Sequence, residues 1–313
     1  MIPSALHPVR VHGAAIAGAR FLLVCCLRNE APRLAAFLAH YRALGVDHFL
    51  VIDNVSTDGG PERVLAEPDC SLWRAPGSYR AAAFGMDWCH RLLDAHGRGK
   101  WCLTVDLDEF LVHPHAGERG LPGLTRHMDK IGQPALFTVL LDCYGPGRLS
   151  DTPLADGADP RQVCPCFDRF NFTQRLGKHR DHLWVQGGVR QRRFFADAPD
   201  EAPALNKLPL VRWERGLRYV SSTHFLNRPG HNLFLSGHPE AVSGVLLHYK
   251  FVAGLIDKSA EEVQRREHYA GAAEYRSYAM RGDVVLHDPQ VSLRYDGPAQ
   301  LERLGFMQRG TWF

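Results

Sequence analysis

Two continuous apolar runs with a helical pattern between them constrain the fold of this chain most. The runs Phe21–Leu27 and His48–Ile52 have the length and composition of strands that are buried on both faces. Between them, apolar residues recur every three or four positions from Pro32 to Leu44, and Gly45 ends the pattern. A strand, a helix and a strand in this order predict a βαβ unit with a right-handed crossover.

The alternation continues along the chain. A helical pattern over Ala81–Ala95 precedes apolar runs at Trp101–Val105 and Ala135–Leu141, and another run follows at Gly244–Phe251. Alternating strands and helices predict an α/β fold with a mostly parallel sheet and helices on both faces. Polar helical patterns at 259–273 and 275–281 then predict a C-terminal helical extension.

The chain has 313 residues, which corresponds to about two units of average domain size. We expect residues 1–19 to form a loose leader and residues 20–255 to form the main domain. Within that domain, 20–112 would be the nucleotide and metal half and 113–255 the acceptor half. Residues 256–313 would form the helical extension.

Composition excludes several classes of protein. Apolar residues make up 45% and charged residues 23% of the chain, unlike a disordered, collagen-like or integral membrane protein. The net charge of +3 is too small for a dedicated nucleic-acid binder. The apolar stretch from Gly13 to Leu27 contains Arg20 and is shorter than the ~20 residues that span a bilayer. The eight cysteines do not form a disulfide scaffold, and we expect a reducing, cytoplasmic location.

The sequence Asp106-Leu107-Asp108-Glu109 directly follows the apolar run Trp101–Val105. The carboxyl ends of parallel strands meet at the edge of the sheet where α/β proteins bind ligands. Two carboxylates at positions i and i+2 of a turn can point to one side. They then offer hard oxygen ligands to Mg²⁺ or Mn²⁺ and leave positions open for phosphate oxygens. The alternative interpretation is a solvated loop.

A second polar segment, Asp53-Asn54-Val55-Ser56-Thr57-Asp58, ends another buried strand. Asp53 can accept a hydrogen bond from a base N–H or a ribose hydroxyl, and Ser56 and Asp58 can shape the turn. Alone, the segment has the composition of an ordinary Asx-rich turn. Beside the acidic motif, at the same sheet edge, it indicates a nucleotide site.

These segments resemble those of family-2-like glycosyltransferases with a GT-A fold, in the bacterial branch related to family 92. Members of that branch carry an "RNE" or "KNE" opening, a "DN-S-D" turn and a "D-DEF" metal motif, in this order. The matching segments here are Arg28-Asn29-Glu30, Asp53 to Asp58, and Asp106 to Phe110. The resemblance covers residues 20–112 well and continues more loosely to about residue 260.

The resemblance implies a hexosyltransferase-type enzyme of polysaccharide biosynthesis that uses a nucleotide diphosphate-sugar, in particular a UDP-sugar. The sugar would move, with inversion, to a hydroxyl of a glycan, a lipid or another acceptor. No nucleic acid is expected as a partner, and peripheral contact with the inner face of a membrane is left open. The implied nucleotide-sugar-binding residues are Arg28, Asn29, Glu30, Asp53, Asn54, Ser56, Asp58, Asp106, Lys207 and Arg212.

The resemblance also implies a bound Mn²⁺ or Mg²⁺, with Asp106 and Asp108 as ligands. Such an ion bridges the two phosphates and offsets the charge that develops on the leaving group. Family members often add a later histidine to the metal. His248, within an apolar run, is the expected ligand, and His224 is the alternative.

The middle third of the chain is basic. From Arg161 to Arg218 there are 12 Lys and Arg against 6 Asp and Glu. Arg190, Arg192 and Arg193 are expected either to neutralise a pyrophosphate or to form a solvated basic face.

The acceptor side departs from the family. Relatives often carry a "W-x-x-F-G-S-S-G" loop after the fourth strand, where this chain has 141–147, LDCYGPG. The acceptor is therefore not defined by the resemblance. An inverting mechanism needs a carboxylate base near the acceptor hydroxyl. Asp181 and Glu214 are candidates, as is Asp142, and the sequence does not rank them.

Three other interpretations compete. A haloacid dehalogenase-type phosphatase also has Asp-x-Asp after an apolar strand, but it needs Thr or Val where Phe110 stands. A nucleotidyltransferase acting on a sugar phosphate needs a glycine-rich loop after its first strand to bind a triphosphate, and Leu27–Pro32 contains no glycine. A non-catalytic sugar- or partner-binding protein is the alternative from a different class.

Overall fold

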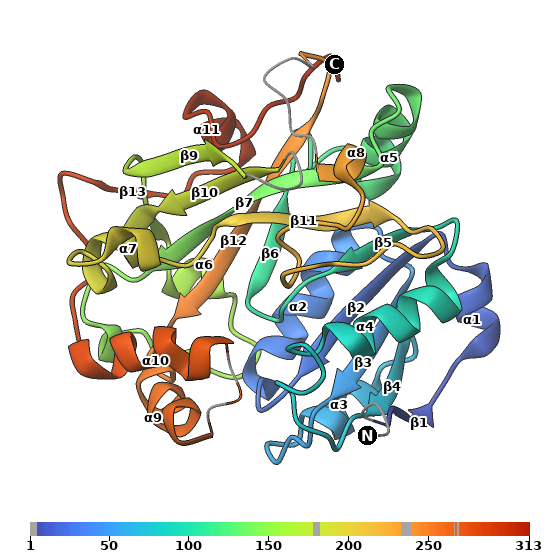
Figure 1. The fold of residues 1–313 in the computed structure, drawn as a ribbon, viewed down its shortest axis with the longest axis horizontal. Coiled ribbons are helices and arrows are strands. Elements are labelled where there is room, and N and C mark those ends of the chain that lie inside the picture. Colours follow the sequence, from blue (N-terminus) through green and yellow to red (C-terminus); the bar gives the residue numbers. More distant parts are fainter. Residues whose placement is uncertain (1–4, 178–181, 233–238, 266, 268) are drawn as a thin grey trace.

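A computed structural model describes residues 5–177, 182–232, 239–265, 267 and 269–313. Its main feature is a large twisted sheet in the order β1-β4-β3-β2-β5-β11-β7-β12-β6, and β8 and β13 extend it from β7. A separate hairpin, β9 with β10, lies beside it (Figure 1). The strands are β1 (His7–Arg10), β2 (Phe21–Leu27), β3 (His48–Asp53), β4 (Cys70–Arg74), β5 (Trp101–Thr104), β6 (Glu109–Val112), β7 (Ala135–Tyr144), β8 (Cys166–Asp168), β9 (Phe172–Leu176), β10 (Leu183–Gly187), β11 (Asn206–Arg212), β12 (Ser243–Phe251) and β13 (Ser292–Arg294).

The strands of the main sheet run mostly in one direction. β2 is parallel to β3 and β5, β3 is parallel to β4, and β7 is parallel to β12. β11 lies between β5 and β7 and is antiparallel to both, so β5 and β7 share a direction. β6 is antiparallel to β12. The predicted α/β class with a mostly parallel sheet is confirmed.

Helices cover both faces of the sheet, as predicted. Successive side chains of a strand point to opposite faces. Cys26 at the end of β2 contacts Cys89 of α4, with 3.9 Å between the sulfur atoms, whereas the next residue, Leu27, lies against Gly60 at the start of α3. The helices are α1 (Gly13–Gly18), α2 (Ala31–Leu44), α3 (Gly60–Ala66), α4 (Met86–Leu92), α5 (Gly120–Lys130), α6 (Pro160–Val163), α7 (Gly188–Phe194), α8 (Pro229–Asn232), α9 (Leu255–Arg265), α10 (Tyr269–Arg281) and α11 (Pro298–Arg303).

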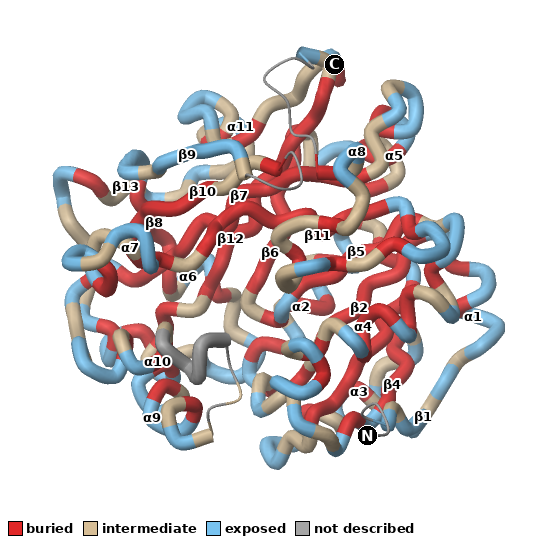
Figure 2. The backbone as a smooth tube through the Cα atoms, viewed as in Figure 1, coloured by how far each residue is buried: buried red, intermediate tan, exposed pale blue. Residues whose placement is uncertain are grey.

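The core follows the apolar strands. β3 and β7 are buried along their whole length, and β2 and β12 are buried at all but one residue each. Figure 2 shows this as a continuous buried band through the sheet, with exposed residues concentrated in the loops and on the outer helices. Burial on both faces explains why these strands are uniformly apolar instead of alternating.

The N-terminal segment differs from the expected loose leader. β1 pairs antiparallel with β4, and Arg10 donates hydrogen bonds to the carbonyl oxygens of Val64, Glu67 and Cys70. The carbonyls of Val64 and Glu67 lie at the end of α3, where a helix leaves acceptors unpaired, and the carbonyl of Cys70 lies at the start of β4. The segment therefore belongs to the edge of the sheet.

Two helix predictions were wrong in their boundaries. α4 begins at Met86 instead of residue 81, because Ala83, Phe84 and Gly85 adopt positive φ angles of 50°, 57° and 79°. A Cβ at Gly85 would lie 2.9 Å from the sulfur of Cys26, so this close turn requires glycine. In the C-terminal part, α9 ends at Arg265 and α10 begins at Tyr269, so residue 274 lies inside a helix and not between two.

The C-terminal extension is helical but also contributes to the sheet. β13 pairs with β8, which pairs in turn with β7. The division of the chain at residues 112 and 255 remains a prediction. Over the part of the chain that the structure describes, no helix has both the length and the apolar composition to cross a bilayer.

We expect Tyr41→Phe to lower the free energy of unfolding by about 1–3 kcal/mol, because two buried backbone groups lose their partner. The Tyr41 hydroxyl donates to the carbonyl of Glu109 at 2.8 Å and accepts from the amide of Leu111 at 3.2 Å. Denaturant unfolding measures the change. Tyr295→Phe is the control, since that tyrosine is only half-buried; equal losses in both variants would contradict the prediction.

Candidate active site at the carboxyl edge of the sheet

One edge of the sheet collects the chemically distinctive side chains. Asp53 is the last residue of β3, Asp106 lies just beyond the end of β5, and His248 lies in the carboxyl-terminal half of β12. Because β11 and β6 run the other way, their first residues, including Lys207 and Glu109, reach the same edge. The topology therefore brings residues from distant parts of the sequence together, at the edge where α/β folds bind ligands.

The acidic motif forms a tight turn between β5 and β6. The amide of Glu109 donates to the carbonyl of Asp106 at 3.0 Å, and the amide of Asp106 donates to the carboxylate of Glu109 at 3.2 Å. The side chain of Glu109 is buried, whereas Asp106 is exposed at the edge. The three acids thus differ in burial, with Glu109 buried, Asp108 half-buried and Asp106 exposed.

Lys207 is the buried partner of Glu109. Its Nζ lies 3.0 Å from Oε1 of Glu109. Burial would lower the pKa of Lys207, but the carboxylates of Glu109 and Asp106 outweigh burial and raise it. The ammonium group therefore keeps its charge in the interior and holds the base of the acidic turn.

His248 and Asp108 form the closest approach of the predicted metal residues. Nε2 of His248 lies 3.4 Å from Oδ2 of Asp108. Burial would lower the pKa of His248, but Asp108 and Asp142 together raise it. Burial would raise the pKa of Asp108, but the neighbouring charge and hydrogen bond of His248 hold it well below its usual range. The backbone supports the contact, since the amide of Tyr249 donates to the carbonyl of Asp108 at 2.8 Å.

On its other side, His248 belongs to a buried polar network. Its Nδ1 lies 2.6 Å from Oδ1 of Asp142, and Arg190 contacts both oxygens of that carboxylate, at 3.1 Å and 2.5 Å. Arg190 also lies 3.4 Å from Glu274, which contacts Lys250 at 3.1 Å. Burial would raise the pKa of Asp142, but Arg190 and His248 lower it. Because both carboxylate oxygens of Asp142 have protein partners, Asp142 is not placed as a free catalytic base, a role for which the sequence made it a candidate.

The two predicted nucleotide loops bind each other. The guanidinium of Arg28 donates to the carbonyl of Asn54 at 2.6 Å, and the side-chain oxygen of Asn29 accepts from the amide of Thr57 at 2.8 Å. Asn29 and Val55 have positive φ angles of 51° and 59°, conformations that are costly for a β-branched residue such as Val55. These contacts give the loops a defined shape.

Carboxylates within these loops cap their turns. Asp53 is buried and accepts from the amide of Ser56 at 2.9 Å. Asp58 accepts from the amide of Ala31 at 2.7 Å and so joins the loop to the start of α2. Glu30 pairs with Arg33 at 2.7 Å and with Lys258 of α9. Asp53, Asp58 and Glu30, which were predicted to bind the nucleotide-sugar, therefore have structural roles in these loops.

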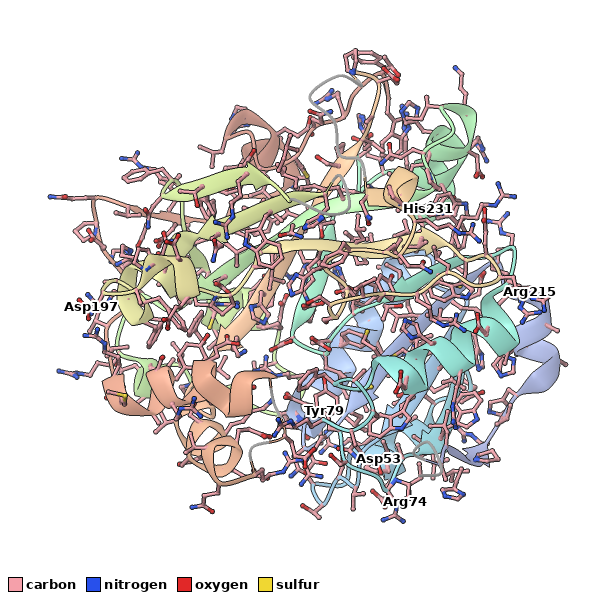
Figure 3. All side chains as sticks on the ribbon, viewed as in Figure 1. Asp53, Arg74, Tyr79, Asp197, Arg215 and His231 are labelled. Carbon is pink, nitrogen blue, oxygen red and sulfur yellow. The ribbon has the colours of Figure 1, made fainter. Side chains whose placement is uncertain are left out.

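A pocket of about 260 Å³ lies beside these loops. Its walls come from the nucleotide loops, from the segment after β4 and from the end of α9, with Arg28, Asn54, Val55, Pro76, Gly77, Ser78, Tyr79, Arg265 and Glu267 as lining residues. Figure 3 shows Asp53 and Tyr79 in this part of the molecule. Glu267 closes one side, since it accepts from the hydroxyl of Ser78 at 2.6 Å and from the amide of Arg80 at 2.9 Å.

The structure does not bring all predicted residues to this edge. Arg212 pairs in register with Trp101 at the beginning of β5, so Arg212 and the following Glu214 lie at the opposite edge of the sheet. The label of the adjacent Arg215 in Figure 3 marks that side. Exposed Glu214 pairs there with Arg228. The other predicted base, Asp181, lies outside the described residues.

His224 and the basic segment also find protein partners. Nδ1 of His224 lies 2.7 Å from the carbonyl oxygen of Asn206, and burial lowers the pKa of this histidine to about 3. Arg190 binds Asp142 and Glu274, and Arg192 contacts Asp168 at 2.9 Å. The expectation that these two arginines form a free anion-binding or solvated face was wrong, because buried carboxylates take their donors.

Sequence reasoning missed the partners of the predicted residues. Lys250 and Glu274 sit in segments that carry no motif, and only the apolar run around Lys250 indicated a buried strand. Asp142 was a candidate base, but nothing in the sequence indicated that it contacts His248. Among the described residues, no group of three or more His, Cys, Asp and Glu side chains has the spacing of a metal site. The protein itself thus offers a pair of converging donors, Asp108 and His248.

Comparisons of the sequence with known families and with curated proteins find no match. Among solved structures, the mannosyltransferase PcManGT from Pyrobaculum calidifontis, in complex with GDP-Man and Mn²⁺, matches with 22% identity and a TM-score of 0.28. That match covers 42% of this chain and 37% of the mannosyltransferase.

Two further matches are equally remote. Glucosyl-3-phosphoglycerate synthase from Mycobacterium tuberculosis, in complex with Mn²⁺, UDP and glucosyl-3-phosphoglycerate, matches with 17% identity over 41% of this chain and 46% of that one, at a TM-score of 0.26. A 4-diphosphocytidyl-2C-methyl-D-erythritol synthase matches with 12% identity over 92% of this chain and 96% of that one, at a TM-score of 0.31. Matches this distant assign no reaction to the chain.

We expect Glu274 to stabilise the fold at neutral pH and to lose this effect in acid. Burial would raise the pKa of Glu274, but Lys250 and Arg190 outweigh it and lower that pKa strongly. A carboxyl group with a lowered folded-state pKa contributes stability above its unfolded pKa of about 4.3, and the contribution falls as the pH drops below that value.

The measurement is urea unfolding of the parent and of Glu274→Gln at pH 7, 5 and 4. The stability difference between the two proteins should be largest at pH 7 and should shrink at pH 4. Glu214→Gln, which alters an exposed ion pair, serves as the matched control with a small effect throughout. A difference that grows towards pH 4 would show that Glu274 is not held as a buried anion.

Proposed function

We propose that this protein is a metal-dependent glycosyltransferase that uses a nucleotide diphosphate-sugar. The observation that carries the proposal is the convergence of Asp108 Oδ2 and His248 Nε2, 3.4 Å apart, at the carboxyl edge of the sheet. The loops that match the family's nucleotide motif end at this same edge. A binding protein without chemistry has no need for this acidic turn beside a nucleotide-type pocket.

The residues present fit a divalent cation. A carboxylate oxygen and an imidazole nitrogen suit Mn²⁺ and, with more oxygen ligands, Mg²⁺. Asp108 and His248 would hold the ion, and exposed Asp106 would complete the protein's share or act through water. Two or three protein donors leave positions for the oxygens of a diphosphate. When bound, the ion supplies charge that stabilises the departing nucleotide diphosphate.

The nucleoside fits the pocket beside the loops. Its volume of about 260 Å³ and its mixture of Arg28, Asn54 and main-chain groups suit a base with its ribose. Asp53 would contact the base or the ribose, as the family resemblance implies, and Lys207 would stabilise the acidic turn. A UDP-sugar is the proposed donor, within the branch related to family 92, and inversion is the proposed outcome.

The acceptor and the catalytic base are further parts of the proposal. The acceptor is a hydroxyl of a glycan, a lipid or another molecule, in a pathway that builds polysaccharide. Asp181 is the proposed base, because Glu214 lies at the opposite edge of the sheet from Asp108. All eight cysteines are free, which supports the proposed location in the reducing cytoplasm, with peripheral contact to the membrane's inner face as part of the proposal.

We expect Mn²⁺ and UDP to bind cooperatively, and Asp108→Asn to remove the metal-dependent part of UDP binding. The reason is that the protein and the diphosphate each supply only part of the coordination shell. Calorimetric titration of UDP with and without Mn²⁺ tests this, followed by a screen of nucleotide-sugars for hydrolysis. Thermal melting is the control, because asparagine keeps the size and shape of the half-buried Asp108 side chain.

Each result has a direct meaning. Metal-dependent UDP binding that Asp108→Asn abolishes, with an unchanged melting temperature, supports the proposal. UDP binding by the parent protein that is the same with and without Mn²⁺ indicates a non-catalytic binding protein. Turnover of a sugar phosphate with a nucleoside triphosphate in the same screen would replace the proposal by a nucleotidyltransferase.

A second prediction separates the two histidines. His248→Ala should lower Mn²⁺ affinity by at least tenfold, because the ion loses a donor atom. A tenfold change corresponds to about 1.4 kcal/mol of binding free energy. His224→Ala should leave Mn²⁺ affinity within about twofold and act on turnover, because His248 is the histidine whose Nε2 contacts Asp108. Equal Mn²⁺ affinity for His248→Ala and the parent would exclude His248 as a ligand.

A further inference from the structure

Two groups of opposite hydrogen-bonding character compete for Nδ1 of His248. Oδ1 of Asp142 lies 2.6 Å from this nitrogen, and Nη2 of Arg190 lies 3.0 Å from it. A carboxylate only accepts hydrogen bonds, and a guanidinium only donates them. Asp142 therefore favours a proton on Nδ1, whereas Arg190 favours a lone pair there.

We propose that Asp142 is a positioning residue that holds the proton on Nδ1 in the neutral, metal-binding form of His248, and so leaves the Nε2 lone pair for a cation beside Asp108. The inference rests on the proposed function, because it assigns Nε2 the task of binding the divalent cation. The shorter of the two contacts is the one to Asp142, which places the carboxylate in the dominant position. Neutral imidazole that donates from one nitrogen binds metal through the other.

The fold holds this arrangement rigidly. Asp142 on β7 and His248 on β12 are direct partners in the parallel ladder, so their side chains leave the same face of the sheet. Arg190 of α7 grips both oxygens of Asp142 and fixes the orientation of the carboxylate plane. The side chains of Asp142 and Arg190 are 2% and 4% exposed, so water does not compete for these contacts.

Loss of Asp142 would leave Arg190 as the remaining neighbour of Nδ1. Its N–H group would then donate to Nδ1, and the single proton of the neutral ring would move to Nε2. The nitrogen that faces Asp108 would carry a hydrogen and have no lone pair for a cation. The residue thus acts on metal binding through the histidine and touches neither the cation nor the substrate.

The experiment measures Mn²⁺ binding to the full chain by calorimetry, for the parent, for Asp142→Ala and for the double variant Asp142→Ala/Arg190→Met. We expect Asp142→Ala to lower Mn²⁺ affinity 10–100-fold, the usual effect of removing a group that orients a ligand. The double variant should recover much of this loss, because the competing donor is gone. A merely structural role would make the double variant worse than the single one.

Two further variants complete the design. Asp142→Asn keeps the shape of the site if the alanine variant does not fold, and its single acceptor oxygen faces the donors of both Arg190 and His248, so affinity should also fall. Glu274→Gln is the matched control, since it removes another partner of Arg190 and leaves Asp142 and His248 in place. Its Mn²⁺ affinity should stay within about twofold of the parent.

The outcomes are distinct. If the parent binds Mn²⁺ and Asp142→Ala or Asp142→Asn binds it equally well, the positioning role is wrong and the proposed function stands. If the double variant or Glu274→Gln loses as much affinity as Asp142→Ala, the effect is one of general packing, and the positioning role is again wrong. If the parent binds Mn²⁺ neither alone nor in the presence of UDP, the proposed function fails and the inference fails with it.

Discussion

Charged side chains that are buried at the carboxyl edge of the sheet must find partners there, and the rest of the site depends on how they do so. Removing an ion from water is costly unless an opposite charge and hydrogen bonds replace the solvent. Lys207 forms an ion pair with Glu109, and Arg190 forms one with Asp142, both within the protein interior. Asp108 and His248, which contact each other at 3.4 Å, are the groups that we propose to bind the cation.

Much of the fold could be predicted because local patterns fix it. The apolar runs of β2 and β3 and the helix between them follow from period and length alone, and the structure has them within a few residues of the predicted bounds. The expected loose leader was different because pairing with β4 overrides weak local preference. The start of α4 was misplaced because the positive φ angles at residues 83–85 depend on the close approach of Cys26, which no local pattern reveals.

The site could be predicted only in part, for a related reason. Asp53 and Asp106 follow buried strands, so their place at one edge follows from the strand pattern. The direction of β11 does not follow from the strand pattern, because nothing in its sequence indicates that it is antiparallel to its neighbours. That direction brings Lys207 to the edge and carries Arg212 and Glu214 away from it. Partner choice between distant charged residues, such as Arg190 and Asp142, is likewise a property of the assembled sheet.

The distance along the sequence between Asp108 and His248 has a consequence for how the protein is made. The strands β2 to β5 and the nucleotide loops lie within the first third of the chain, and their contacts are mostly between near neighbours in the sheet. β12, by contrast, pairs with β6 and β7 only after the whole middle third has been synthesised. Since chains are produced from the N-terminus, the acidic turn leaves the ribosome well before His248 does. The contact between Asp108 and His248 can therefore form only after β12 has been synthesised and has paired with β6 and β7.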